Sequence, residues 1–412
     1  MRIALFSPMP PETSGVADYA VLLLPALRRH ADVVVVKRGT KRPPRGIDLP
    51  VYHIGNDPSH HGWIVDAFRR APGPVVLHDV VLHHLVAGIT LARGDGRAYL
   101  DALEREGGLP ARLLGHAVME HRIPALWDTR AVDLPLLRSV IEPATSIVVH
   151  SRHAATRVRA SGFDRPVTVV PHPAWPVPDV TPEPVEGGPV IAAFGNLNAS
   201  KRIPQLLEAF ARVRGELPGA RLLLVGEPSP GFDLARRLER LGLEATGITC
   251  TGRVDERRLW NLMATADVHV NLRSPTMGET SGTVIRALSL GKPLVVSAAG
   301  WFAELPDDVA LKVPVDETEP QLLADGLRLL LTRADVRASM GAAALRLARE
   351  QHNLDRVAER QVAAFELALG GPAVDDRVLG AVSAAAADVG IEPGSGEARE
   401  LARRLSEVEL GG

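Results

Sequence analysis

Short apolar runs alternate with helical runs along this chain, and one proline-rich stretch interrupts the alternation. The apolar runs are continuous and rich in β-branched residues, which is typical of parallel strands buried on both faces. They cover residues 2–6, 33–36, 51–54, 75–78, 147–150 and 167–170, and then 190–194, 221–225, 248–251, 268–271 and 294–297. Helical runs such as 16–30 and 62–71 lie between them. This order predicts doubly wound α/β sheets.

The interruption reads PHPAWPVPDVTPEPVEGGP over residues 171–189, too proline-rich for a helix or a central strand. A chain of 412 residues also exceeds what one hydrophobic core usually supports. We therefore expect a Rossmann-like domain at 1–175, a linker at 176–189 and a second Rossmann-like domain at 190–370. Residues 371–412 form a tail with a charged helix near 395–410, whose packing the sequence does not assign. Ligands of such sheets bind at the carboxyl ends of the strands, so the active site should lie in the cleft between the domains.

Composition excludes several classes of protein. The net charge of -2 argues against a nucleic-acid partner, whose binding surface would be strongly basic. The single cysteine, Cys250, excludes an intramolecular disulfide framework and fits a reducing compartment. No run reaches the length of a membrane helix, and the start, MRIALFSP, lacks a long apolar segment. We expect a cytoplasmic protein. Seven basic residues at positions 28–45 form either solvated surface or a peripheral membrane contact.

The segment at 274–304 reads as loop, helix, turn and strand. Its helical run carries apolar residues at 284, 285, 288 and 290 and stops at Gly291 and Pro293. Thr280, Ser281 and Gly282 stand just before the helix, where a hydroxyl can cap backbone amides and a glycine admits a ligand. The helix dipole would favour a phosphate at this point.

Polar residues follow several strands of the first half. Ser14 and Gly15 form the turn after the first strand, and YHIGNDPSHH follows the third, with Asn56 a candidate for an acceptor pocket. His78 and Asp79 end the next strand at the expected cleft. His83 and His84 read as helix-start residues, although the run HDVVLHH also suggests metal ligands. His150 and His172, which follow later strands, are either site residues or satisfied turn histidines.

The segment at 274–304 and a second one, FGNLNASKR at 194–202, resemble the nucleotide-sugar signature of the retaining GT-B glycosyltransferases of family four, the glycosyl transferases group 1. Glu279, Gly282, Ala287, Gly291 and Pro293 fall on the frame E-G-F-G-L-P-x-L-E-A-M-A-x-G-x-P. In FGNLNASKR, Gly195 and Lys201 match G-R-L-x-x-x-K-G. The chain departs from the pattern twice, because Asn196 replaces an arginine and Arg286 stands where the second glutamate belongs.

The resemblance implies a set of site residues. Lys201 would clamp the leaving diphosphate, and His78 would lie beside the donor sugar. Arg286 is hypothesised to supply the second phosphate-binding cation, which Asn196 does not provide; the alternative is that Arg286 points into solvent. The implied donor-binding residues are Gly15, Gly195, Asn196, Lys201, Gly226, Arg253, Val254, Glu279, Thr280, Ser281 and Gly282. The acceptor-binding residues would be Ser14, Asn56 and Asp79.

The implied activity is transfer of a sugar from a nucleoside-diphosphate sugar to an acceptor hydroxyl with retention, by a hexosyltransferase-type enzyme that needs no metal and no cofactor. The acceptor would be a carbohydrate, a lipid-linked molecule or a small molecule. A nucleotide-sugar epimerase of the same fold and a decayed nucleotide- or glycan-binding protein remain alternatives. A glycosidase is disfavoured because no paired carboxylates are evident, and an NAD enzyme because no G-x-G-x-x-G follows the first strand.

Overall fold

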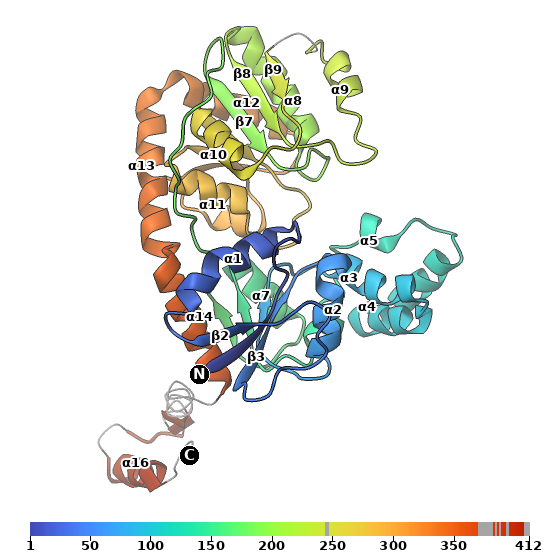
Figure 1. The fold of residues 1–412 in the computed structure, drawn as a ribbon, viewed down its shortest axis with the longest axis vertical. Coiled ribbons are helices and arrows are strands. Elements are labelled where there is room, and N and C mark those ends of the chain that lie inside the picture. Colours follow the sequence, from blue (N-terminus) through green and yellow to red (C-terminus); the bar gives the residue numbers. More distant parts are fainter. Residues whose placement is uncertain (244–246, 370–381, 384, 387–388, 393–394, 408–412) are drawn as a thin grey trace.

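The computed structural model of the chain contains two α/β domains, each built on a parallel six-stranded sheet (Figure 1). It describes residues 1–243, 247–369, 382–383, 385–386, 389–392 and 395–407. Part of the expected tail therefore lies outside the described residues. Within the described residues, the charged helix expected in the tail is α16 (Gly396–Glu407). The GT-B architecture predicted from the sequence is confirmed, since two doubly wound sheets are present.

The first sheet has the order β2-β1-β3-β4-β5-β6. Its strands are β1 (Arg2–Phe6), β2 (Asp32–Val35), β3 (Leu49–Ile54), β4 (Val75–Leu77), β5 (Ile147–Val149) and β6 (Val167–Val169). The helices are α1 (Gly15–Leu27), α2 (Pro58–Phe68), α3 (His83–Ile89), η1 (Leu91–Arg93), α4 (Gly96–Met119), α5 (Leu126–Thr129), α6 (Arg138–Ile141) and α7 (Arg152–Ala160). The strand order reverses between β1 and β3, which is where a ligand site is expected in such a sheet.

The second sheet has the order β12-β11-β10-β7-β8-β9, with its reversal between β7 and β10. Its strands are β7 (Val190–Phe194), β8 (Arg221–Val225), β9 (Ile248–Cys250), β10 (Val268–Asn271), β11 (Leu294–Ser297) and β12 (Ala310–Val313). The helices are α8 (Ile203–Glu216), α9 (Leu234–Arg240), α10 (Glu256–Thr265), α11 (Gly282–Ser289), η2 (Gly300–Glu304), α12 (Glu319–Thr332), α13 (Ala334–Gln351) and α14 (Leu354–Ala368). The sequence pattern did not predict β12.

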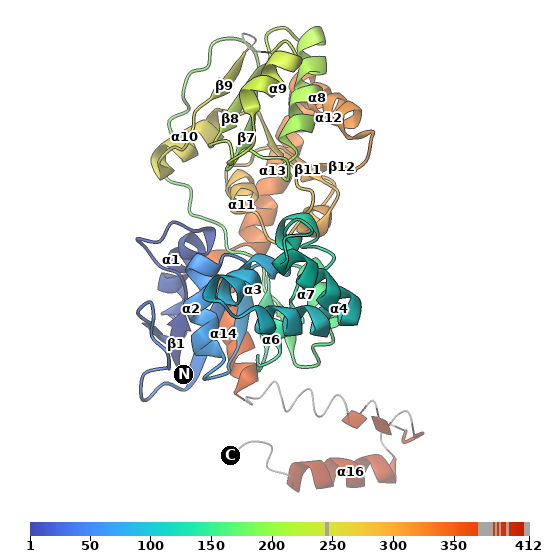
Figure 2. The same cartoon turned by 90° about the vertical axis from the view of Figure 1, so that its right-hand side faces the viewer.

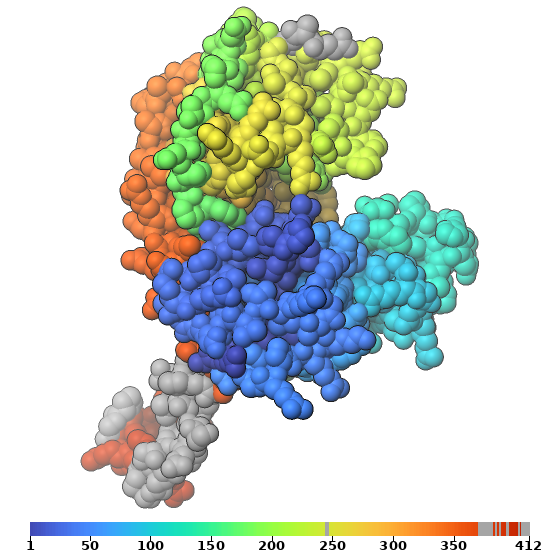
Figure 3. Space-filling model, viewed as in Figure 1, coloured from blue at the N-terminus to red at the C-terminus, as the bar shows by residue number. Residues whose placement is uncertain are grey.

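The last of these helices returns to the first domain. We expected the second domain to run to residue 370, but α14 packs on α1, and Val357, Val362 and Phe365 share a buried core with Tyr19 and Leu23. Figures 1 and 3 show α13 and α14 in orange along one side of the molecule, and Figure 2 shows the same helices from another side, running from the second domain to the first. The chain therefore crosses between the domains twice, once through the proline-rich linker and once between α13 and α14.

The two domains meet at the carboxyl ends of their strands. Val80, just after β4, donates its amide hydrogen to the carbonyl of Met277, in the loop after β10, at 2.8 Å. The carboxylate of Glu304 accepts hydrogen bonds from the amides of Arg152 (3.1 Å) and His153 (2.5 Å) at the start of α7. An acidic group there is favoured by the helix dipole. Glu304 therefore ties the second domain to the first.

Candidate active site

A cavity of about 400 Å³ lies between the domains at the first sheet's reversal point. It is lined by Thr13, Ser14, Gly15, Val16, Asp18, Tyr19, Asn56, Asp57, His60, His61, His78, Asp79, His150, His172, Trp175, Glu279, Thr280, Gly282 and Arg286. Nine residues predicted for the site are among them: Ser14, Gly15, Asn56, His78, Asp79, Glu279, Thr280, Gly282 and Arg286. Loops from both domains therefore converge on one chamber.

The other predicted residues follow strands of the second sheet and do not line this chamber. Gly195, Asn196 and Lys201 follow β7, Gly226 follows β8, and Arg253 and Val254 follow β9. None of them lines the cavity. Ser281 is also absent from the lining; it is buried as the cap of α11, and its hydroxyl accepts a hydrogen bond from the amide of Val284.

The ammonium of Lys201 lies directly over the backbone of Gly195. Its Nζ donates to the carbonyl of Phe194 at 2.8 Å, and a Cβ on Gly195 would stand 2.1 Å from that Nζ. Gly195 has φ +90°, a conformation that favours glycine. Burial, followed by the positive charge of Arg273, lowers the pKa of Lys201 from 10.5 to about 7. The structure thus holds a desolvated amine at the end of β7.

Arg273 is a second cation at this point that the sequence analysis did not select. The Ser274 amide donates to the Ser200 carbonyl at 2.8 Å, so the chain segments that carry Arg273 and Lys201 run side by side. Arg273 Nε lies 2.8 Å from Glu279 Oε1. A signal was available, because Arg273 follows a predicted strand at its carboxyl end. The family signature instead points to Asn196, which is exposed.

Glu279 is held by its own loop. Its Oε2 accepts hydrogen bonds from the Met277 amide at 2.7 Å and from the Thr276 hydroxyl at 3.0 Å. Across the chamber, Asp79 accepts a hydrogen bond from the Asn56 amide at 2.8 Å. Burial, followed by the negative charge of Glu279, raises the pKa of Asp79 to about 7. Two carboxyl groups from different domains thus influence one another within the same chamber.

Arg286 does not point into solvent. It is 6% exposed, and its guanidinium carbon lies 3.8 Å from the ring centroid of Trp175, in the proline-rich stretch between β6 and β7. Its Nη2 donates to Glu256 Oε1 at 3.1 Å. A cation over an indole face is favoured by the ring quadrupole. Arg286 therefore joins the wall of the chamber to this proline-rich stretch, and its contact with phosphate stays a prediction.

The run HDVVLHH does not converge on one point. Both ring nitrogens of His83 are engaged, one with the carbonyl of Leu134 at 2.7 Å and the other with the Tyr99 hydroxyl at 2.8 Å. His84 instead lies 3.3 Å from Asp128. In the part of the chain that the structure describes, no three His, Cys, Asp or Glu side chains are grouped as a metal site requires.

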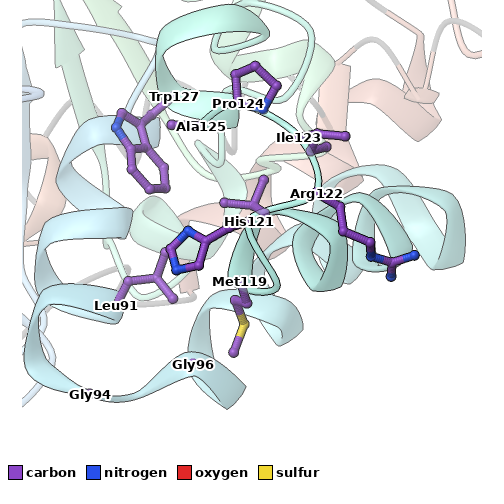
Figure 4. Close-up of a pocket in the computed structure, with 11 residues that line it drawn as sticks. Leu91, Gly94, Gly96, Met119, His121, Arg122, Ile123, Pro124, Ala125 and Trp127 are labelled. Atoms are coloured by element: carbon purple, nitrogen blue, oxygen red, sulfur yellow. The ribbon is translucent and has the colours of Figure 1, made fainter.

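A larger cavity of about 820 Å³ lies beside α4 and α5, away from both reversal points (Figure 4). Leu91, Val118, Met119, Ile123 and Trp127 give it a mainly apolar lining. It contains no carboxylate among its lining residues.

Among the helices that the structure describes, none has both the length and the apolar character needed to cross a membrane.

Comparison with known proteins agrees with this architecture. The family described as Glycosyl transferases group 1 matches residues 188–333. A D-inositol 3-phosphate glycosyltransferase from Segniliparus rotundus is 26% identical over 328 residues, which are 76% of this chain and 65% of that protein. This chain thus spans slightly less than two thirds of the length of that curated relative.

Solved structures show the same fold at low sequence identity. HepE from Anabaena, crystallised with UDP-glucose, has a TM-score of 0.60 at 16% identity, over 89% of this chain and 99% of its own. Sucrose-phosphate synthase from Thermosynechococcus elongatus has a TM-score of 0.58 at 18% identity, over 89% of this chain and 98% of its own. Residues 188–333 are therefore a glycosyl transferases group 1 domain, and they belong to a chain with the GT-B glycosyltransferase fold.

Proposed function

We propose that the protein transfers a sugar from a nucleoside-diphosphate sugar to an acceptor hydroxyl, with retention of the anomeric configuration. The observation that carries the proposal is the convergence of Lys201, Arg273 and the start of α11 at the reversal point of the second sheet, facing the chamber of the first domain. Cations and helix amides are the groups that stabilise a departing diphosphate. UDP-glucose in the similarly folded HepE supports a nucleotide-sugar donor.

The diphosphate would bind at the carboxyl ends of β7 and β10. Gly226 and Gly195 bring the ends of β8 and β7 together closely, because a Cβ on Gly226 would stand 2.2 Å from the Gly195 carbonyl oxygen. Thr280 adds a hydroxyl that is shielded from solvent and has no hydrogen-bond partner among the described residues. Lys201 would move from the Phe194 carbonyl to the diphosphate, where its charge would be needed most.

The acceptor would occupy the chamber of the first domain. In this arrangement the leaving phosphate takes the proton of the acceptor hydroxyl as the new glycosidic bond forms, so no protein base is required. The cations would supply the charge that a metal ion supplies elsewhere, and we propose a reaction without a metal or another cofactor. Contacts between the domains would exclude water from the donor during transfer.

A thermal-shift screen against UDP, GDP, ADP and dTDP tests the proposal. A ligand present at 100 times its Kd should add about 2.7 kcal/mol to the free energy of unfolding. The nucleoside diphosphate that stabilises the protein most identifies the base of the donor. The corresponding sugar nucleotide is then incubated with and without a panel of acceptors, and the product's anomeric configuration is determined. Failure of all four nucleotides to bind would contradict the proposal. Epimerisation of the donor without acceptor would instead indicate an epimerase.

A further inference from the structure

Four histidine side chains surround Tyr19 at the carboxyl ends of β3, β4, β5 and β6. The ring centroids of His53, His78, His150 and His172 lie 5.5, 4.8, 5.1 and 5.0 Å from that of Tyr19. We call these four residues the histidine wall. His78, His150 and His172 line the chamber between the domains, whereas His53 lies behind them and is 1% exposed. The wall belongs to the first domain, opposite the donor loops.

Hydrogen bonds fix the protonation of two of these rings. His150 Nδ1 lies 2.9 Å from the carbonyl of Val170, and His172 Nδ1 lies 2.8 Å from the carbonyl of Pro173. A carbonyl oxygen only accepts, so each Nδ1 carries a hydrogen, and a neutral ring then presents a lone pair at Nε2. Burial lowers the pKa of His150 to about 4 and lowers that of His172 as well, which keeps both rings neutral.

Two side chains that line the chamber each carry an unpaired ring nitrogen, counted over the described residues. Nε2 of His78 and Nε2 of His150 are shielded from solvent and have no hydrogen-bond partner among the described residues. His150 is 6% exposed, and both side chains line the chamber. Buried polar atoms without partners are rare, and each one calls for an explanation such as a ligand site. A partner for Nε2 of His150 must be a hydrogen-bond donor.

The charges around the chamber restrict that donor further. Asp18, Asp57, Asp79 and Glu279 line it together with the histidines. Arg286 is the only lysine or arginine among the lining residues that the structure describes, and its guanidinium already pairs with Glu256. A phosphate group placed against the wall would meet lone pairs and carboxylates. A hydroxyl group would supply the hydrogen that Nε2 of His150 lacks.

We propose that the histidine wall binds an uncharged polyol, a sugar or cyclitol without a phosphate, one of whose hydroxyls donates to Nε2 of His150. This inference rests on the proposed function, because it makes that polyol the acceptor of the transfer. A chamber of about 400 Å³ is within the size range of small-molecule sites. The wall would orient the acceptor, and an adjacent hydroxyl would face the donor sugar.

Calorimetric titrations test the proposal, with myo-inositol, glucose and glycerol and their monophosphate esters as probes and with the nucleotide from the screen present. At least one neutral probe should bind about tenfold more tightly than its phosphate ester. His150→Phe keeps a ring beside Tyr19 and removes the acceptor nitrogen, so it should weaken neutral-probe binding about five- to tenfold, as expected for one hydrogen bond. Nucleotide affinity should stay unchanged in this variant.

His352→Phe is the matched control. His352 is equally buried and donates through Nδ1 to a carbonyl, that of His172, at 2.7 Å, but it does not line the chamber. This variant should bind the probes like the wild type. Tighter binding of the phosphate esters, binding of no neutral probe, or equal effects of the two substitutions would overturn the inference. Polyol binding without any nucleotide binding would instead refute the sugar transfer and leave the polyol site standing.

Discussion

The affinity for a sugar nucleotide should fall as the pH rises, because Lys201 must be charged to hold the diphosphate. Burial and the charge of Arg273 lower the pKa of Lys201 to about 7 in the unliganded protein. A bound diphosphate favours the ammonium and raises that pKa again. The charged fraction of unliganded Lys201 is then about one half at pH 7 and about one hundredth at pH 9. The apparent Kd should therefore rise about fiftyfold over this interval, since only the charged fraction binds.

Isothermal titration at pH 6, 7, 8 and 9 measures this change. The sugar nucleotide is the appropriate ligand, because its diphosphate is doubly esterified and has no group that titrates in this range. Repeating the titrations in buffers of different ionisation enthalpy should show proton uptake on binding above pH 7. Lys201→Met should bind weakly at every pH and show no slope. A wild-type Kd that stays constant from pH 7 to pH 9 would mean that diphosphate binding does not depend on the charge of Lys201.

The burial of Lys201 gives stability the opposite pH dependence, because the free energy of unfolding should rise with pH where ligand affinity falls. The folded-state pKa of about 7 lies below the unfolded value of 10.5, so the unfolded chain binds more protons between these values and the free energy of unfolding rises with pH there. At pH 7 the uptake of a proton on unfolding destabilises the fold by at most about 4 kcal/mol. Lys201→Met should therefore raise the melting temperature of the unliganded protein at pH 7. A lower melting temperature would show that the charge is better solvated than its burial indicates.

Three further substitutions probe the surroundings of Lys201 and the contact between the domains. Gly195→Ala should reduce nucleotide affinity about tenfold or more, as loss of a charged hydrogen bond does, because the new Cβ displaces the Lys201 ammonium; titration with an unchanged circular-dichroism spectrum measures it. Glu304→Gln should lower the free energy of unfolding by about 1 kcal/mol, because it weakens the cap of α7. It should also increase the radius of gyration measured by small-angle scattering. Glu319→Gln should lower the free energy of unfolding by about 3 kcal/mol, because Glu319 is fully buried and pairs with Arg202, next to Lys201; denaturant titration measures it.

The sequence predicted the sheets well because their strands are continuous apolar runs. Strands β1, β7, β8, β10 and β11 begin and end where we expected. The missed strand, β12, reads ALKV and lies at the edge of its sheet, where half-buried Lys312 breaks the apolar run. The return of α14 could not be predicted either. An amphipathic helix shows which of its faces is buried, but its sequence does not show which domain provides the partner surface.

The candidate site was predictable where position along a strand decides it. Ser14, His78 and Asp79 follow strands of a parallel sheet, and the topology alone brings them to one edge. The partners of individual side chains could not be predicted from the sequence. The hydrogen bond of Lys201 to the Phe194 carbonyl, for example, depends on side-chain rotamers and on the backbone conformation of Gly195. The four rings around Tyr19 come from strands up to about 120 residues apart in the chain, a separation over which a single sequence carries no pairing signal.

Two arginines could replace the cation that the family has at the position of Asn196, and the structure separates their roles. Arg286 stacks on Trp175 and pairs with Glu256 in the wall of the chamber, so a phosphate would have to compete with both contacts. Arg273 lies beside Lys201, and its side chain pairs with Glu279 on the donor loop. We therefore expect Arg273→Ala to weaken nucleoside-diphosphate binding about ten- to a hundredfold while leaving binding of the bare nucleoside unchanged. Arg286→Ala should mainly lower the melting temperature, and Arg346→Ala, on an exposed pair in the same domain, serves as control. If Arg286→Ala rather than Arg273→Ala abolishes diphosphate binding, Arg286 is the replacement for the family's arginine, and the chamber, not the end of β10, receives the phosphate.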